Sequence, residues 1–173
     1  MMRHIALLMM LAVGIAGCES QAVREEKAVN AIIKLGGEVT RDEELPGRPI
    51  AAVGLNNTKV TDSDLKGLKE LKGLQWLDIS NTQITDAGLK ELRELKGLRH
   101  LALQNTQITD AGLKELKGLQ TLNLYGTHIT DAGLKYLKEL KGLQILNLSV
   151  TKITDAGLKD LMQALPEIEG SGP

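Results

Sequence analysis

The stretch NTQITDAGLKEL occurs twice in this chain, at Asn81–Leu92 and, letter for letter, at Asn105–Leu116. Its central step, Val or Ile followed by Thr-Asp, recurs at intervals of 24, 24, 21 and 24 residues, at Val60, Ile84, Ile108, Ile129 and Ile153. Repetition at such a period is typical of proteins whose units bury their apolar faces against neighbouring units. The invariant phrase therefore predicts a structural unit, and a function is expected at the positions that vary.

Two hydrophobic periods within each unit predict one strand followed by one helix. In the segment LQWLDIS, Leu77 and Ile79 alternate with Trp76 and Asp78, and a period of two indicates a strand. In the following DAGLKELRELKGL, leucines recur every three residues, which predicts a one-sided helix. The 21-residue unit lacks about one turn of that helix. Stacked units of this kind form a curved solenoid with a parallel sheet inside and helices outside.

The consensus L-x-x-L-x-L-x-x-T-x-I-T-D-x-x-L-x-x-L resembles the leucine-rich-repeat family. Its ITDAGL wording is similar to the cysteine-containing, ribonuclease-inhibitor-like subclass, which is known from F-box proteins and many bacterial proteins. The resemblance implies an α/β fold over residues 50–165: a right-handed solenoid of five repeats, with a parallel β-sheet on the concave face and α-helices on the convex face. Where that subclass usually has Cys or Asn, this chain has Thr58, Thr82, Thr106, Thr127 and Thr151.

The repeated polar residues have structural explanations. An inward-facing Thr hydroxyl is expected to bond backbone groups where the strand ends. The Thr-Asp pair is expected to start the next helix, with Asp capping that helix. A row of carboxylates is also a potential cation site, but each Asp has a helix start of its own to cap, so we predict no metal site and no cofactor. The row consists of Asp62, Asp86, Asp110, Asp131 and Asp155.

The N-terminus reads MMRHIALLMMLAVGIAGC, with one early positive charge and an apolar run too short to span a bilayer. The segment IAGC, Ile15–Cys18, resembles a bacterial lipobox. It predicts a signal peptide at 1–17, lipidation of Cys18, and a protein anchored by acyl chains in the bacterial cell envelope, periplasmic or surface-exposed. The alternative is an ordinary secretory signal that contains a Cys. Cys18 is the only cysteine, so no intramolecular disulfide can form.

The segments that flank the repeats are predicted to close the solenoid. Residues 18–49 comprise the lipidated Cys, a short tether, a helix with an apolar stripe, and an edge strand, and they are expected to form an N-terminal cap. The stripe consists of Ala22, Val29, Ile32, Ile33 and Leu35. Residues 166–173 follow the last helix, begin with a helix-breaking proline, and are expected to be a frayed C-terminal tail.

Variable strand positions that point out of the concave face are the predicted binding surface. They include an exposed Trp and a Tyr, residue types that are favoured as interface anchors. This pattern predicts a monomeric module that binds another protein or an envelope polymer. The alternative is a structural envelope lipoprotein without a specific ligand. The candidate partner-binding residues are Trp76, Asp78, His100, Gln104, Asn123, Tyr125 and Asn147.

Other functional classes are disfavoured. A net charge of −1 gives no basic excess for nucleic acid. The exported chain would hold only His100 and His128, without a zinc motif or phosphate loop, so we predict no enzyme and no catalytic residue, although His100 could face Asp78. The resemblance also suggests a substrate-receptor role in ubiquitin ligases, but an F-box-like module is missing. The Lys-rich helices are expected to be a solvated outer face rather than an anionic-lipid patch.

Overall fold

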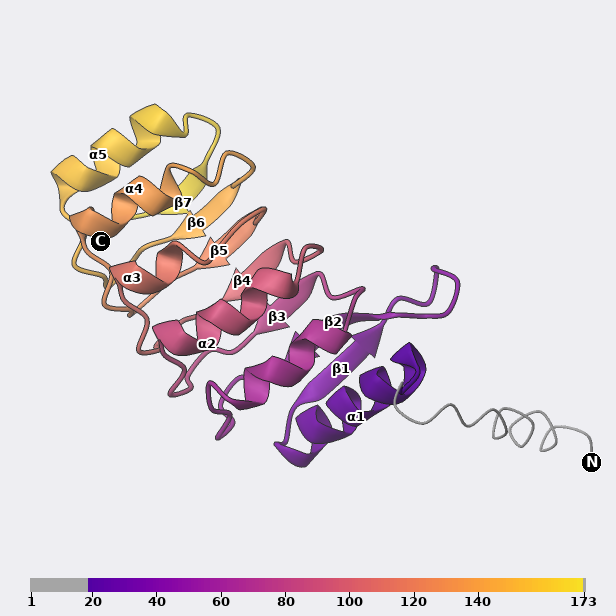
Figure 1. Cartoon of the computed structure of the whole chain (residues 1–173). Coiled ribbons are helices and arrows are strands. Elements are labelled where there is room, and N and C mark those ends of the chain that lie inside the picture. The colour runs from indigo at the N-terminus through magenta and orange to yellow at the C-terminus, as the bar shows by residue number, and fades with distance from the viewer. Residues whose placement is uncertain (1–18, 173) are drawn as a thin grey trace, which may run out of the picture.

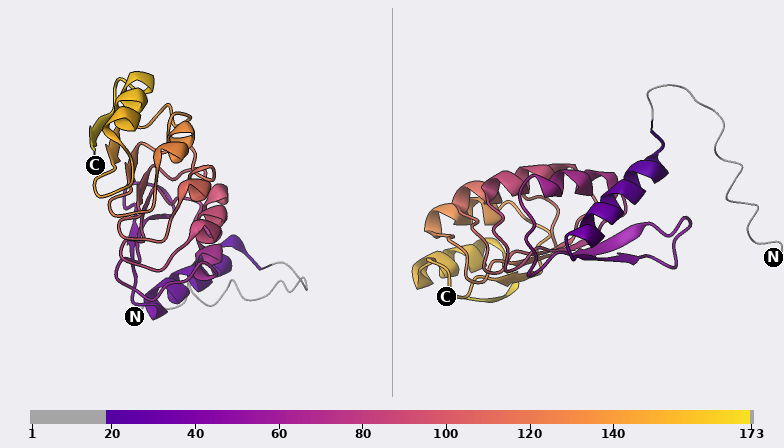
Figure 2. Two further views of the ribbon diagram at one scale, coloured as in Figure 1. Left: turned by 90° about the vertical axis from the view of Figure 1, so that its left-hand side faces the viewer. Right: turned by 90° about the horizontal axis from the view of Figure 1, so that it is seen from below.

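The computed structural model of the chain describes residues 19–172 and has an arched α/β architecture (Figure 1). A seven-stranded sheet lines the inner side of the arch, and helical segments cover the outer side (Figure 2). The strands follow one another in chain order from β1 to β7. This arrangement confirms the predicted right-handed solenoid of strand-helix units. The predicted signal peptide and Cys18 lie outside the described residues.

The sheet begins with one antiparallel pair and continues in parallel. β1 runs antiparallel to β2, and each later strand runs parallel to the one before it. The parallel strands keep a constant register, so equivalent residues of successive repeats stand side by side. The strands are β1 (Glu38–Arg41), β2 (Ile50–Gly54), β3 (Trp76–Asp78), β4 (His100–Ala102), β5 (Thr121–Asn123), β6 (Ile145–Asn147) and β7 (Glu169–Ser171).

Stacked aliphatic side chains fill the space between the sheet and the helical layer. One central residue is buried in each strand from β2 to β6, and so are most leucines that recur along the helical segments. Side chains in such layers pack at crystal-like density, which suits a chain with few aromatic residues. The buried strand residues are Val53, Leu77, Leu101, Leu122 and Leu146.

The convex segments are shorter than predicted and are partly 3₁₀-helical. A leucine at every third residue matches the 3.0 residues per turn of a 3₁₀-helix better than the 3.6 of an α-helix. In the last repeat the buried Leu161 and Leu165 are four residues apart, and the segment is a ten-residue α-helix. The segments after the cap helix α1 (Gln21–Lys34) are η1 (Asp64–Glu70), α2 (Asp86–Glu91), η2 (Leu92–Glu94), α3 (Asp110–Leu113), η3 (Asp131–Gly133), α4 (Leu134–Leu137) and α5 (Asp155–Ala164).

The inward Thr of each repeat has the predicted role. The Thr82 hydroxyl donates to the carbonyl oxygen of Ile79 at 2.7 Å, and the same bond recurs in all five repeats. Each of these hydroxyls therefore satisfies a carbonyl where the strand ends, within its own repeat.

The prediction that each Asp caps its own helix is wrong. Thr85 is the N-cap residue of α2, and its hydroxyl accepts the Ala87 N–H at 3.2 Å. Asp86 instead reaches into the next repeat, where its carboxylate accepts the Thr109 N–H at 2.9 Å and the Thr109 hydroxyl at 2.6 Å. The same pair of bonds joins Asp62 to Thr85, Asp110 to Thr130 and Asp131 to Thr154. The motif thus joins neighbouring repeats, an interaction that one repeat considered alone does not reveal.

The N-terminal end of the solenoid is closed by a different residue and by the cap. No earlier repeat supplies an Asp to Thr61, and Asp64, which stands where later repeats have Gly, accepts both the Thr61 N–H and its hydroxyl. The cap helix α1 buries Ala28 and Ile32 against the core. Ile33 is 56% exposed, so its assignment to the apolar stripe was wrong.

The C-terminal end is more ordered than predicted. Residues Glu169–Ser171 form β7, which pairs in parallel with β6 in the register of the preceding strands. Ile168 packs partly buried against the core. The expectation of a frayed tail is therefore wrong for these residues, because backbone pairing with β6 holds a segment that lacks the leucine pattern.

Candidate binding surface

The parallel register places the predicted binding residues in columns across the concave face. The first column is Trp76, His100, Thr121 and Ile145, and the second is Asp78, Ala102, Asn123 and Asn147. Backbone bonds just beyond the strands align a third column, Ser80, Gln104, Tyr125 and Ser149. All seven predicted residues lie in these three columns.

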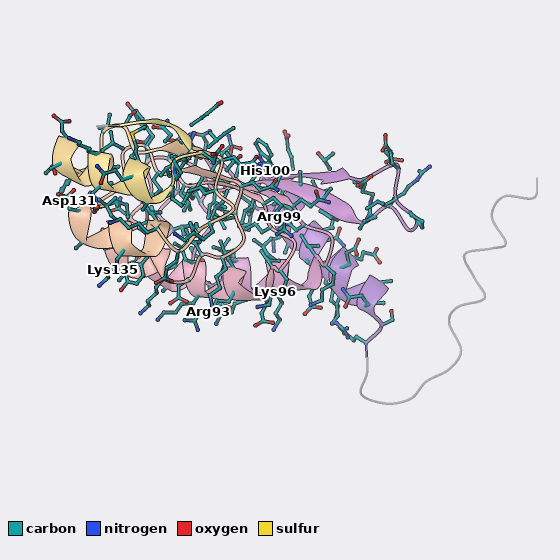
Figure 3. The ribbon with its side chains drawn as sticks, turned by 90° about the horizontal axis from the view of Figure 1, so that it is seen from above. Arg93, Lys96, Arg99, His100, Asp131 and Lys135 are labelled. Carbon is teal, nitrogen blue, oxygen red and sulfur yellow. The ribbon has the colours of Figure 1, made fainter. Side chains whose placement is uncertain are left out.

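An aromatic stack occupies the centre of the first column. The rings of Trp76 and His100 lie 5.0 Å apart, centroid to centroid, with an interplanar angle of 27°. The His100 Nδ1 lies 3.0 Å from the Thr121 hydroxyl, which orients the imidazole from its other side. Trp76 is nevertheless 49% exposed. Figure 3 shows His100 on the sheet side of the molecule, away from the helical side on which Arg93 and Lys135 lie.

Polar side chains of the second column are partly engaged in local turns. The carboxylate of Asp78 accepts the backbone N–H of Ser80 at 2.9 Å. In the same way Asn123 accepts the N–H of Tyr125, and Asn147 accepts the N–H two residues later. These Asx-type bonds shape the strand-to-turn transition, so part of the polarity assigned to ligand binding has a structural role.

The third column contributes one side-chain pair and one exposed ring. The Ser80 hydroxyl donates to the Gln104 Oε1, which joins repeats 2 and 3. Tyr125 is 39% exposed beyond the end of β5. This column therefore presents an amide and a phenol on the same face as the Trp76 stack.

Two exposed apolar residues of this surface were not among the predicted binding residues. Ile145 is 51% exposed in the first column, and Val150 is 63% exposed at the turn after β6. Val150 has a φ of 58°, at a position where three other repeats have Asn and one has Gly, all with positive φ. An apolar residue at a variable position of the concave face was the sequence feature that identified Trp76. The same feature applies to Ile145.

The geometry offers little for catalysis or metal binding. His100 pairs with Thr121 rather than with Asp78. His128 is exposed, three residues beyond the third column. Within residues 19–172 no group of three or more metal-ligating side chains is close enough to hold an ion. Across the same range, every helix is too short or too polar to span a bilayer.

Two family models match the repeats. One, described as "Leucine Rich repeats (2 copies)", matches residues 72–118, and the other, described as "Leucine Rich repeat", matches residues 119–138 and 143–162. A search of curated proteins found no match.

Solved structures show the same fold. The chain is 28% identical to an internalin (inlF) from Listeria monocytogenes, with a TM-score of 0.59 over 69% of this chain and 34% of that one. A leucine-rich-repeat protein from Leptospira interrogans is 23% identical, with a TM-score of 0.51 over 70% of this chain and 36% of that one, and this similarity concerns the fold alone. The chain thus spans about a third of either protein.

Proposed function

Because this chain is built from leucine-rich repeats, we propose that it is a non-catalytic, monomeric binding module whose concave face contacts a protein partner. The fold supports a protein-interaction role in general. The partner-binding residues in this proposal are the seven predicted ones together with Ile145 and Val150.

The observation that carries this proposal is the exposed Trp76–His100 stack. Half-exposed Trp on a sheet face contributes little to the core, yet stacking on His100 holds its ring in one orientation. A rigid aromatic ring loses little conformational entropy on binding, and Trp and Tyr dominate the binding free energy at many interfaces. Asp78, Gln104 and Tyr125 add hydrogen-bonding groups in the two neighbouring columns, and polar groups of this kind are typical of the rim of an interface.

We further propose that the chain acts in a bacterial cell envelope, anchored by acyl chains on Cys18. The lipobox-like sequence IAGC supports this location, and α1 begins only three residues after Cys18. Acyl chains contribute about 0.8 kcal/mol per buried methylene to anchoring. Mass spectrometry of the N-terminal peptide from mature protein tests the anchor, and an unmodified Cys18 contradicts it.

The binding proposal is tested by photo-crosslinking in the native envelope. A photoreactive amino acid at Thr121, between the Trp76 stack and Ile145, is expected to give a discrete crosslinked protein that disappears in the Trp76→Ala/Tyr125→Ala variant. Met162→Ala, a truncation of an exposed side chain on α5, is the matched control and should leave the product unchanged. A crosslinking pattern that is the same in all three forms contradicts the proposal.

Two other functions remain as competing outcomes of this experiment. A structural envelope lipoprotein without a specific ligand predicts no discrete product at all, whereas an envelope polymer as the ligand predicts a heterogeneous product that glycan-degrading enzymes remove. A substrate-receptor role in a ubiquitin ligase has no support in residues 19–172, where the helix and strand before the repeats form a cap that packs on the core.

A further inference from the structure

A hollow lies in the convex layer where the third repeat is one turn shorter than the second. Its volume is about 400 Å³, within the range of small-ligand sites. The second repeat contributes Arg93, Glu94 and Lys96 to its walls, and the third contributes Lys114, Glu115 and Lys117. The missing segment corresponds to Arg-Glu-Leu of the second repeat, so the hollow occupies the place of an absent helical turn.

One wall of the hollow holds a buried carboxylate with an unsatisfied oxygen. The Glu115 side chain is only 1% exposed, and its Oε2 pairs with Arg93 Nε. Its Oε1 accepts no hydrogen bond from any residue between 19 and 172. A buried polar atom without a partner is rare and destabilising, because it has lost its hydrogen bonds to water and has formed none within the protein. A ligand that donates a hydrogen bond would satisfy Oε1.

The other walls favour an anion. Arg93 and Glu115 neutralise each other, which leaves the ammonium groups of Lys96, Lys114 and Lys117 against the single carboxylate of Glu94. Lys96 donates to the Arg93 carbonyl oxygen at 2.8 Å, which holds its ammonium near the hollow. Figure 3 shows Arg93 and Lys96 on the helical side, opposite the surface that carries His100. The site therefore combines an excess of positive charge with one buried acceptor.

We propose that this hollow binds an aminoalkyl phosphate, with the chemistry of phosphoethanolamine. Its phosphate lies among Lys96, Lys114 and Lys117, since ammonium groups bind phosphate through charge-assisted hydrogen bonds. Its ammonium donates to Glu115 Oε1, while Oε2 keeps its pairing with Arg93. The ligand is either a soluble aminoalkyl phosphate or a lipid headgroup. The lipid source rests on the membrane anchor proposed above, whereas the site itself does not.

Calorimetric titration of the purified chain with phosphoethanolamine tests the site. We expect saturable binding that weakens at least tenfold in Lys96→Gln/Lys117→Gln. The control Lys66→Gln/Lys159→Gln removes the same charge from exposed convex lysines outside the hollow and should bind as the wild type does. Absence of saturable binding overturns the proposal, and so does equal weakening in both variants, which would indicate a general charge effect.

A second variant tests the buried acceptor. Glu115→Gln removes the charge of the carboxylate but preserves its shape, so we expect it to weaken phosphoethanolamine binding while inorganic phosphate binds at least as well as to the wild type. Equal losses for both probes would contradict a role for Oε1.

The source of the ligand is tested with vesicles and a Cys18→Ser chain, which lacks acyl chains. Sedimentation with phosphatidylcholine vesicles that contain phosphatidylethanolamine, but not with phosphatidylcholine alone, supports a headgroup as ligand. Binding of free phosphoethanolamine without vesicle binding supports the site and overturns the lipid source. None of these variants alters the concave face, so failure here is distinguishable from failure of the partner-binding proposal.

Discussion

At the residue scale, the recurring Thr-Asp pair and the Gly two residues after the Asp explain how one repeat is joined to the next. Asp62 accepts two hydrogen bonds from Thr85, and the Thr85 hydroxyl in turn accepts the Ala87 N–H at the start of α2. Gly88 leaves room for that carboxylate, because a Cβ at Gly88 would lie 2.5 Å from Asp62 Oδ1. Each residue of the motif therefore has a partner in an adjacent repeat or at the helix start.

This geometry predicts that Gly88→Ala destabilises the protein, although alanine normally favours a helix by about 1 kcal/mol. The added methyl group must displace the Asp62 carboxylate, and overpacking of this kind costs about 1–3 kcal/mol. Gly67→Ala in η1 is the control, since its nearest neighbour would be the Ala28 Cβ at 3.9 Å. Urea denaturation measures the free energy of unfolding of both variants. If the two variants are equally stable, the proposed contact between Gly88 and Asp62 is wrong.

The same bonds predict an acid-sensitive component of stability at Asp131. The backbone N–H of Thr154, and then its hydroxyl, lower the pKa of Asp131 below its ordinary value of 3.8. A lowered folded-state pKa stabilises the native state above the unfolded pKa, and this contribution is lost as the pH falls through the folded pKa. We expect Asp131→Asn to be less stable than wild type at pH 6, with the difference shrinking below about pH 4. Denaturation curves at pH 6, 4, 3 and 2 test this, and a pH-independent difference contradicts it.

At the element scale, the convex segments combine 3₁₀ and α geometry. Leucines three residues apart occur both in the 3₁₀ segment η1 and in the four-residue α4, whereas the last repeat, where Leu161 and Leu165 are four residues apart, has the ten-residue α5. The presence and order of strands and helices could be predicted from sequence, because alternating and one-sided patterns mark strands and helices directly. The final strand β7 could not, because EGS carries no leucine pattern and is held by pairing with β6.

The cap helix is expected to be part of the folding unit. On the side of α1 that faces the core, Ile32 is 4% exposed, whereas the next residue of the helix, Ile33, is 56% exposed. Ile32→Ala leaves a cavity at the end of the core and is expected to lower the free energy of unfolding by about 2–5 kcal/mol. Ile33→Ala removes the same atoms from the surface and should lower it by less than about 1 kcal/mol. Similar effects in denaturation measurements would show that α1 does not seal the core.

At the scale of the whole molecule, the stacked repeats make one continuous core and one continuous binding face. Interactions between adjacent repeats stabilise such a chain, so residues that repeat faithfully maintain the stack. The columns of the concave face could be predicted because register is constant along the solenoid. The hydrogen bonds within these columns could not be predicted, because they depend on turn geometry and on neighbouring repeats. They include the Asx-type bonds of Asp78 and Asn123 and the bond from Ser80 to Gln104.

Val150 is expected to destabilise the fold and to contribute to the proposed binding function. Its side chain is β-branched and 63% exposed, and its backbone adopts the left-handed conformation. In other repeats, Asn57, Asn81 and Asn105 adopt this backbone conformation. A left-handed conformation costs about 1–2 kcal/mol for an ordinary L-residue, and Asn tolerates it better. The Val side chain therefore lowers the stability of the fold, and the proposed function explains its presence as an apolar contact with a protein partner.

Val150→Asn separates these two effects. The variant is expected to raise the free energy of unfolding by about 1 kcal/mol, because Asn relieves the backbone strain. The crosslink from Thr121 is expected to weaken, because an apolar contact on the concave face is lost. A more stable variant with an undiminished crosslink would place Val150 outside the interface, and a less stable one would contradict the assignment of strain. Greater stability combined with weaker binding is the result that only a functional role for Val150 predicts.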